Sequence, residues 1–146
     1  MNKYVELRRR QQEEFNKFPL HFAFGKEQIC EKFSELGLDP HKDLDKIECI
    51  PGTGEFILTK DKLAYMEMSN RHREELISAI KEDKNGDGFI FDMFTAELSN
   101  CEFNYDEDIA IEGALSALGL TLRKVTEDPV LNAGFEKAKK QLRKIS

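Results

Sequence analysis

Apolar residues recur at spacings of three and four in several segments of this chain, and glycine, proline or acidic residues bound each segment. Such spacing places the apolar side chains on one face of an α-helix, so the pattern predicts amphipathic helices around a core. We expect about six helices. The segments with this pattern are residues 2–17, Lys26–Leu36, Lys60–Glu82, Ile90–Cys101, Ile109–Leu118, a brief one at Thr121–Thr126 and one that starts at Pro129.

Local signals also mark where these helices end and begin. Gly37-Leu38 and Gly119-Leu120 each predict a left-handed C-terminal cap with a hydrophobic contact. The acidic residues Asp106–Asp108 suit the N-terminus of a helix, where negative charge is favourable. Asp128-Pro129 predicts the start of the last helix, because proline is well tolerated at the first helical position.

Two short runs of β-branched, aromatic and other apolar residues, Ile47–Ile50 and Phe56–Leu58, flank the turn-rich sequence Pro51–Gly54. This arrangement predicts a β-hairpin, and the loosely alternating segment Pro19–Phe24 is a candidate for pairing with it. The predicted fold class is therefore α+β, predominantly helical, with about six helices around one core and one small β-hairpin. At 146 residues we expect a single domain covering residues 1–146.

The chain has no segment that resembles a membrane span. Its most hydrophobic stretch, Gly88–Phe94, is interrupted by Asp92, and 34% of all residues are charged. Near the N-terminus, Arg8–Arg10 precede Gln11–Glu14, where a signal peptide would need an apolar region. We therefore expect a cytoplasmic protein without membrane contact.

The cysteines and histidines form no recognisable catalytic or metal motif. An odd number of distant cysteines predicts buried free thiols in a reducing compartment rather than disulfides or zinc ligands. His72 lies on the apolar stripe of its predicted helix and is expected to be a partly buried structural residue. No nucleophile, base or carboxylate pair stands out, so we do not expect an enzyme. The residues concerned are Cys30, Cys49, Cys101, His21, His41 and His72.

Charge is distributed unevenly along the chain. The net charge is −6, yet residues 1–17 carry +2 and residues 136–146 carry +4, which leaves −12 for residues 18–135. The basic C-terminal helix presents Lys137, Lys140 and Lys144 on one side, a pattern compatible with nucleic-acid contact. A solvated helix whose charges complement its own dipole is the favoured interpretation, because the rest of the chain is acidic. Nucleic acid is therefore not an expected partner.

The segment Asp83–Phe94 resembles the calcium loop of an EF-hand. Oxygen ligands stand at loop positions one, three and five, as Asp83, Asn85 and Asp87, and glycine and an aliphatic residue occupy positions six and eight. The carbonyl of Phe89 would supply a further ligand. These four residues, Asp83, Asn85, Asp87 and Phe89, are the candidate metal ligands, for weakly bound Ca²⁺ or Mg²⁺.

Position twelve argues for a structural interpretation of the same segment. An EF-hand closes there with a bidentate glutamate, whereas this chain has Phe94, which continues the apolar face of its helix. No second loop with the required glycine is present to form an EF-hand pair. Aspartate, asparagine and glycine are also what a tight turn between two helices uses, so a structural turn without any cofactor is the favoured interpretation.

Several blocks of the sequence resemble a family of small uncharacterised proteins, a domain of unknown function carried by phages and other mobile elements of gut bacteria. The resemblance covers nearly the whole chain and implies no activity, cofactor or catalytic residue. It implies that Gly86–Phe94 is the hallmark of the family and that the protein is an accessory factor rather than a metabolic one. The blocks are Lys3–Leu7, Gln11–Phe15, Phe22–Phe24, Gly86–Phe94 and Leu118–Leu122.

Two functional hypotheses follow. In the first, the protein is a non-enzymatic binding or regulatory protein of a phage or mobile element, with a protein partner, and acts as an acidic inhibitor of a host nucleic-acid-binding protein. In the second, it is a weak cation-binding module with a degenerate EF-hand-like loop at Asp83–Phe94. The first is favoured by the acidic body and the second by the loop residues.

Overall fold

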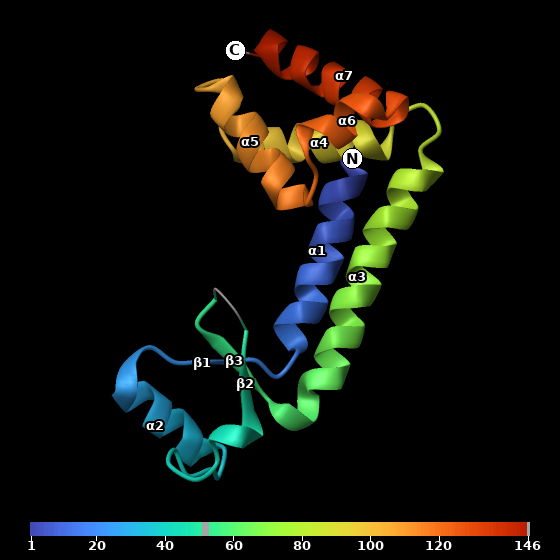
Figure 1. The fold of residues 1–146 in the computed structure, drawn as a ribbon. Helices are drawn as coiled ribbons and strands as arrows, with labels where there is room; N and C mark the ends of the chain where they lie inside the picture. The colour runs from blue at the N-terminus through green and yellow to red at the C-terminus, as the bar shows by residue number, and fades with distance from the viewer. Residues whose placement is uncertain (51–52, 146) are drawn as a thin grey trace. The chain divides into compact units, whose positions relative to one another are not determined.

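The computed structural model describes residues 1–50 and 53–145, and Figure 1 shows the order of its elements. Seven α-helices, two 3₁₀ turns and a small antiparallel sheet are present in this part of the chain, which confirms the predicted predominantly helical α+β class. The helices are α1 (Lys3–Lys17), α2 (Gly25–Glu35), α3 (Lys62–Glu82), α4 (Phe89–Asn100), α5 (Glu107–Leu118), α6 (Leu122–Glu127) and α7 (Pro129–Ile145). The strands are β1 (His21–Phe22), β2 (Ile47–Cys49) and β3 (Glu55–Leu58).

The chain forms two compact units. The helical unit comprises Met1–Gln11 and Glu74–Ser146, and the sheet unit comprises Gln12–Arg73. The boundary between them therefore falls inside α1 and inside α3. That residues 1–146 form a single domain remains a prediction, because two compact units can unfold either together or separately.

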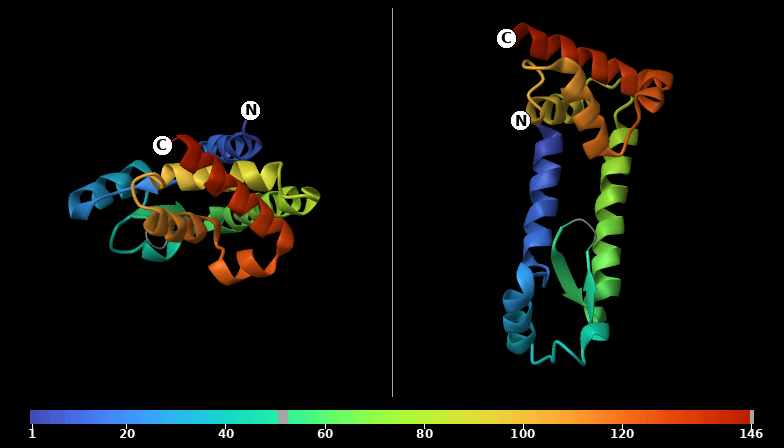
Figure 2. Two further views of the ribbon diagram at one scale, coloured as in Figure 1. Left: turned by 90° about the horizontal axis from the view of Figure 1, so that it is seen from above. Right: turned by 60° about the vertical axis from the view of Figure 1, so that its left-hand side comes forward.

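The core of the helical unit is built around α4. Ile90, Met93, Phe94 and Leu98 are all almost fully buried there, as expected for a helix that is apolar on most of its faces. Figure 2 shows α7 lying across α4, and α4 also packs against α5. The Phe94 ring meets the Phe135 ring of α7 edge to face, with 5.1 Å between centroids.

The predicted helix caps are confirmed. Gly37 and Gly119 adopt positive φ, and the N–H groups of Leu38 and Leu120 donate to the carbonyls of Phe33 and Leu115, as in a Schellman motif. At the N-termini, side chains accept from the first-turn N–H groups of α5, α6 and α7. The residues that accept are Asp106, Thr121 and Asp128. These helices therefore begin and end where the local sequence predicts.

The sheet unit contains the predicted hairpin. Strands β2 and β3 pair antiparallel, with Glu48 opposite Ile57, and β1 pairs with the other edge of β3, so the strand order is β1-β3-β2. The candidate segment Pro19–Phe24 thus supplies the third strand. Phe33 of α2 is fully buried and lies 6.1 Å from the ring of Phe56. Pro51 and Gly52 of the predicted turn lie outside the described residues.

Two details differ from the sequence-based expectation. Helix α3 begins at Lys62 rather than Lys60, because Thr59–Asp61 form a 3₁₀ turn ahead of it. The cysteines carry no disulfide, yet Cys30 and Cys49 are exposed and Cys101 is only partly buried, so the prediction of buried thiols was wrong. An apolar neighbour in sequence did not indicate burial here, because Ile29, beside Cys30, is itself 37% exposed.

Candidate functional site

Asp83 organises the loop between α3 and α4. Its carboxylate oxygens accept hydrogen bonds from the backbone N–H groups of Gly86, Gly88 and Ile90, at 3.0, 3.1 and 2.9 Å. Partial burial opposes ionisation of Asp83, but these donors outweigh burial and hold the pKa of the carboxyl below its ordinary value. Asp83 thus serves as an anionic cap for the turn and for the first residues of α4.

The other predicted ligands differ from Asp83 in their surroundings. Asn85 and Asp87 are exposed. Phe89 is already the first residue of α4 and is buried against the ring of Tyr4, 5.9 Å away. The carbonyl of a helix's first residue points along the helix, away from the preceding loop. Among residues 1–50 and 53–145, no three His, Cys, Asp or Glu side chains form a group suited to a metal ion. This geometry favours the structural turn.

The remaining positions of the loop also have structural roles. Phe94, at position twelve, is fully buried in the core. Asp92, at position ten, accepts a hydrogen bond from the backbone N–H of Lys3 at 2.9 Å, while its own carbonyl accepts from the Asn2 side chain at 3.0 Å. Asp92 therefore caps the N-terminus of α1 across 89 residues of sequence. The sequence interpretation missed this role, since the two partners are distant along the chain.

Gly86 brings the same loop into direct contact with α7. Its φ is +81°, and a Cβ built on it would lie 2.3 Å from the carbonyl oxygen of Val130. Only glycine therefore fits at this position. The segment Gly86–Phe94 thus contacts α7 through Gly86 and α1 through Asp92, and it contains the first residues of α4.

Three basic residues of α7 are engaged with the protein itself, whereas Lys140 and Lys144 of the predicted basic face are exposed. Arg143 donates to both carboxylate oxygens of Glu107, at 3.0 and 2.8 Å, and Lys139 pairs with Glu136 at 2.9 Å. The ammonium of Lys137 lies 4.7 Å from the centre of the Phe91 ring, a cation–π contact. These contacts favour a structural interpretation of the C-terminal positive charge over nucleic-acid binding.

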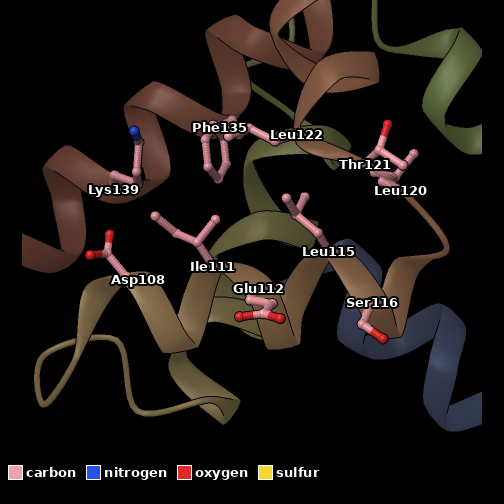
Figure 3. Close-up of a pocket in the computed structure, with 10 residues that line it drawn as sticks. All are labelled: Asp108, Ile111, Glu112, Leu115, Ser116, Leu120, Thr121, Leu122, Phe135 and Lys139. Atoms are coloured by element: carbon pink, nitrogen blue, oxygen red, sulfur yellow. The ribbon is translucent and has the colours of Figure 1, made fainter.

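A hollow of about 660 Å³ lies between α5, α6 and α7 (Figure 3). Ile111 and Leu115 point into it from α5, and Phe135 and Leu122 enter from the opposite side. Its polar residues are Asp108, Glu112, Ser116, Thr121 and Lys139, and Leu120 completes the lining. The lining contains neither histidine nor cysteine. The hollow is an apolar recess with a charged rim, a composition typical of binding pockets.

Two carboxylates on this rim are not neutralised by the protein. Asp108 and Glu112 are exposed, stand four residues apart on α5, and take part in no salt bridge among the described residues. Like charges at this spacing repel each other. Their neighbour Glu107 differs, because Arg143 binds it, and that hydrogen bond lowers the pKa of the Glu107 carboxyl. Asp108 and Glu112 thus form an unbalanced negative edge beside an apolar hollow.

The sequence interpretation missed this site, although the sequence contains a clue to it. The segment Glu107–Leu118 holds three acidic residues and neither lysine nor arginine. Carboxylates on a helix form ion pairs within that helix only when a lysine or arginine stands three or four positions away. This helix has none, so its carboxylates need partners from elsewhere. The apolar lining could not be found in this way, because Leu120, Leu122 and Phe135 come from other segments.

The fold and the site define a small, mainly helical α+β protein with a charged-rim recess on one of its two units. Residues 3–141 match the family of unknown function DUF7659, and the chain belongs to this family. No curated protein and no solved structure matches the chain. Within the described residues, no helix is both long enough and apolar enough to cross a membrane.

Proposed function

We propose that this protein is a non-enzymatic, cytoplasmic binding protein of a phage or other mobile element, which regulates a host protein by occupying its basic, nucleic-acid-binding surface. The observation that carries the proposal is the pair Asp108 and Glu112 at the rim of the apolar hollow. A basic partner would neutralise these carboxylates, and an apolar side chain of the partner would fill the recess. The origin in a mobile element rests on the resemblance of the sequence blocks.

An acidic surface of this kind suits inhibition of a nucleic-acid-binding protein. Such proteins present lysine and arginine to phosphates, and carboxylates at similar spacing compete for the same side chains. Catalysis is not part of the proposal, because Lys139 is paired with Glu136 and Thr121 caps α6. The polar groups of the hollow therefore have positioning roles within the protein or face outward.

Affinity capture from the native host tests the proposal. The tagged full chain should retain a basic, nucleic-acid-binding protein at about 0.05 M salt and release it near 0.5 M, because salt screens charges at the surface of the interface. Added DNA or RNA should compete with the tagged chain for the captured protein and so release it. Retention that is indifferent to both salt and nucleic acid would contradict the proposal, as would capture of acidic proteins only.

The alternative function is a weak Ca²⁺ or Mg²⁺ site at Asp83, Asn85, Asp87 and Phe89. In its favour, a hollow of about 450 Å³ lies at this loop, and Glu82, Asp83 and Asn85 are among the residues that line it. Against it, Asp83 already accepts three backbone hydrogen bonds. Calorimetric titration with each cation separates the two functions. A cation site should give a heat of binding at about millimolar Ca²⁺ or Mg²⁺, a concentration that matches the weakest calcium sites in proteins. A protein-binding role alone predicts no such heat.

A further inference from the structure

We propose that the hollow between α5, α6 and α7 binds a basic amphipathic helix, whose apolar face enters the recess and whose lysine or arginine residues pair with Asp108 and Glu112. This inference rests on the proposed function, since it specifies which structural element of the basic partner is bound and where. It commits to one class of occupant, a helical segment of a protein.

The shape of the hollow matches one face of a helix. Its lining follows α5 from Asp108 to Ser116, which corresponds to about 12 Å of helix. A bound helix presents side chains at positions i, i+3, i+4 and i+7, which extend over a similar length. Two or three apolar side chains of the partner would therefore lie against Ile111, Leu115 and Leu122.

Leu122 is already positioned for such contact. It is 52% exposed, although it faces the recess from α6. Leu115, by contrast, is 6% exposed and forms part of the floor. A partner that covers Leu122 would remove apolar surface from water, which stabilises the complex in proportion to the area buried.

Charge selects the kind of helix. Asp108 and Glu112 lie one helical turn apart, so two basic residues separated by three or four positions on the partner would meet them together. Lys139, on the α7 side, is held by Glu136 at 2.9 Å and lies 4.5 Å from the centre of the Phe135 ring, so its charge is partly compensated. An acidic helix or a phosphate backbone would instead face uncompensated carboxylates.

The test uses fluorescently labelled model peptides of about 15 residues, the length at which an isolated helix becomes marginally stable. The first peptide carries leucine on one face and lysine on the other. The second replaces lysine by glutamate, and the third replaces leucine by serine and keeps the lysines. Fluorescence anisotropy at low salt should show binding of the leucine–lysine peptide, with much weaker binding of the other two. Equal binding of the leucine–glutamate peptide would overturn the proposal.

Variants then locate the binding site. The double variant Asp108→Asn, Glu112→Gln should weaken binding of the leucine–lysine peptide by about tenfold at low salt, the effect expected for two partly exposed charge pairs. Ser116→Trp places a large ring at the rim and should also weaken binding. The control variant Glu74→Gln, Glu82→Gln removes the same charge from exposed positions on α3 and should bind like the wild type. Unchanged affinity in both rim variants would refute the site.

The outcome for this site is distinguishable from that for the proposed function. If the captured host protein is basic and salt-sensitive but binds the Asp108→Asn, Glu112→Gln variant normally, the proposed function stands and this site is refuted. If the rim variants weaken peptide binding but capture yields no basic protein, the site stands and the proposed function fails. Thermal unfolding of each variant establishes that it is folded, and the exposure of Asp108 and Glu112 makes unfolding of that variant unexpected.

Discussion

Gly86 and Gly134 meet backbone to backbone where the loop after α3 contacts α7. A Cβ built on Gly134 would lie 2.5 Å from the carbonyl oxygen of Gly86 and 2.5 Å from Cγ2 of Ile90. Both distances are far below normal carbon contacts, and a backbone oxygen cannot move aside independently of its loop. The contact therefore requires glycine at position 134, in the middle of a helix where glycine is otherwise unfavourable.

We expect Gly134→Ala to destabilise the protein. Alanine should favour helix α7 by roughly 1 kcal/mol through its higher helix propensity. The clash with Gly86 and Ile90 should cost more, since overpacking a core typically costs about 1–3 kcal/mol and this contact involves backbone. Urea denaturation should therefore show a lower free energy of unfolding for the variant.

Gly113→Ala in α5 is the matched control. Its Cβ would approach the Sγ atom of Cys101 at 3.0 Å, which belongs to a partly buried side chain and not to backbone. We expect Gly113→Ala to leave the stability unchanged or to raise it slightly. If the two variants have equal stability, close packing of the loop on α7 does not explain the glycine.

The loop residue Asp83 provides a second prediction. Asp83→Ala leaves three backbone N–H groups without their acceptor, and we expect a loss of about 1–3 kcal/mol in the free energy of unfolding. Asp87→Ala should have little effect on stability, because Asp87 is exposed. Chemical denaturation of both variants without added cation measures the difference. Equal and small losses for the two variants would contradict the capping role of Asp83.

These examples indicate how much of the fold could be predicted. The caps at Gly37, Gly119, Asp106 and Asp128 were predictable, because a helix cap depends on residues within one turn of it. The β-hairpin was predictable for the same local reason, since β2 and β3 are close in sequence. Local chemistry therefore accounts for most of the element boundaries.

Roles that depend on distant segments were not predictable. Asp92 stands at position ten of the EF-hand-like loop, and its partner, the N–H of Lys3, is 89 residues away in sequence. The fit of Gly86 against Val130 depends likewise on how α7 packs. The rim residues Asp108 and Glu112 were predictable in part. The sequence shows that they have no basic neighbours, but it does not show the hollow beside them.

Glu14 provides a third prediction, on pH dependence in the sheet unit. Its carboxylate accepts hydrogen bonds from both terminal nitrogens of Arg71 and contacts Nε2 of His72 at 3.0 Å. Arg71 first, and then His72, lower the pKa of Glu14 from 4.5 to about 2. Because the folded-state pKa is depressed, the stabilising contribution of Glu14 is complete above pH 4.5 and is lost as the pH falls towards 2.

Comparison with Glu14→Gln isolates this contribution. The wild type should be more stable than the variant at neutral pH, and the difference should shrink as the pH falls from about 5 to 2, since Glu14 becomes protonated. Glu13→Gln, an exposed neighbour, should follow the wild type over the whole range. Thermal unfolding at several pH values makes the comparison. A difference between wild type and Glu14→Gln that does not change with pH would refute the assignment.

Tyr4 provides the last prediction, in the helical unit. Its hydroxyl donates to Oε1 of Glu97 at 2.5 Å and accepts from Nε of Arg8 at 3.2 Å, while its ring is buried beside Phe89. Burial, followed by the hydrogen bond to Glu97, raises the pKa of Tyr4 from 10.0 to about 12. A raised pKa means that the contribution of the neutral hydroxyl is complete below pH 10 and is lost as the pH rises towards 12.

Tyr4→Phe should therefore cost about 1 kcal/mol at neutral pH, the net worth of a typical hydrogen bond, because it leaves Glu97 without its donor. Tyr105→Phe is the matched control, since Tyr105 is 91% exposed, and it should have no measurable effect. The near-ultraviolet absorbance of wild type minus Tyr4→Phe isolates the ionisation of Tyr4, which should occur near pH 12. Ionisation of this residue near pH 10 would show that the contact with Glu97 does not hold the proton in solution.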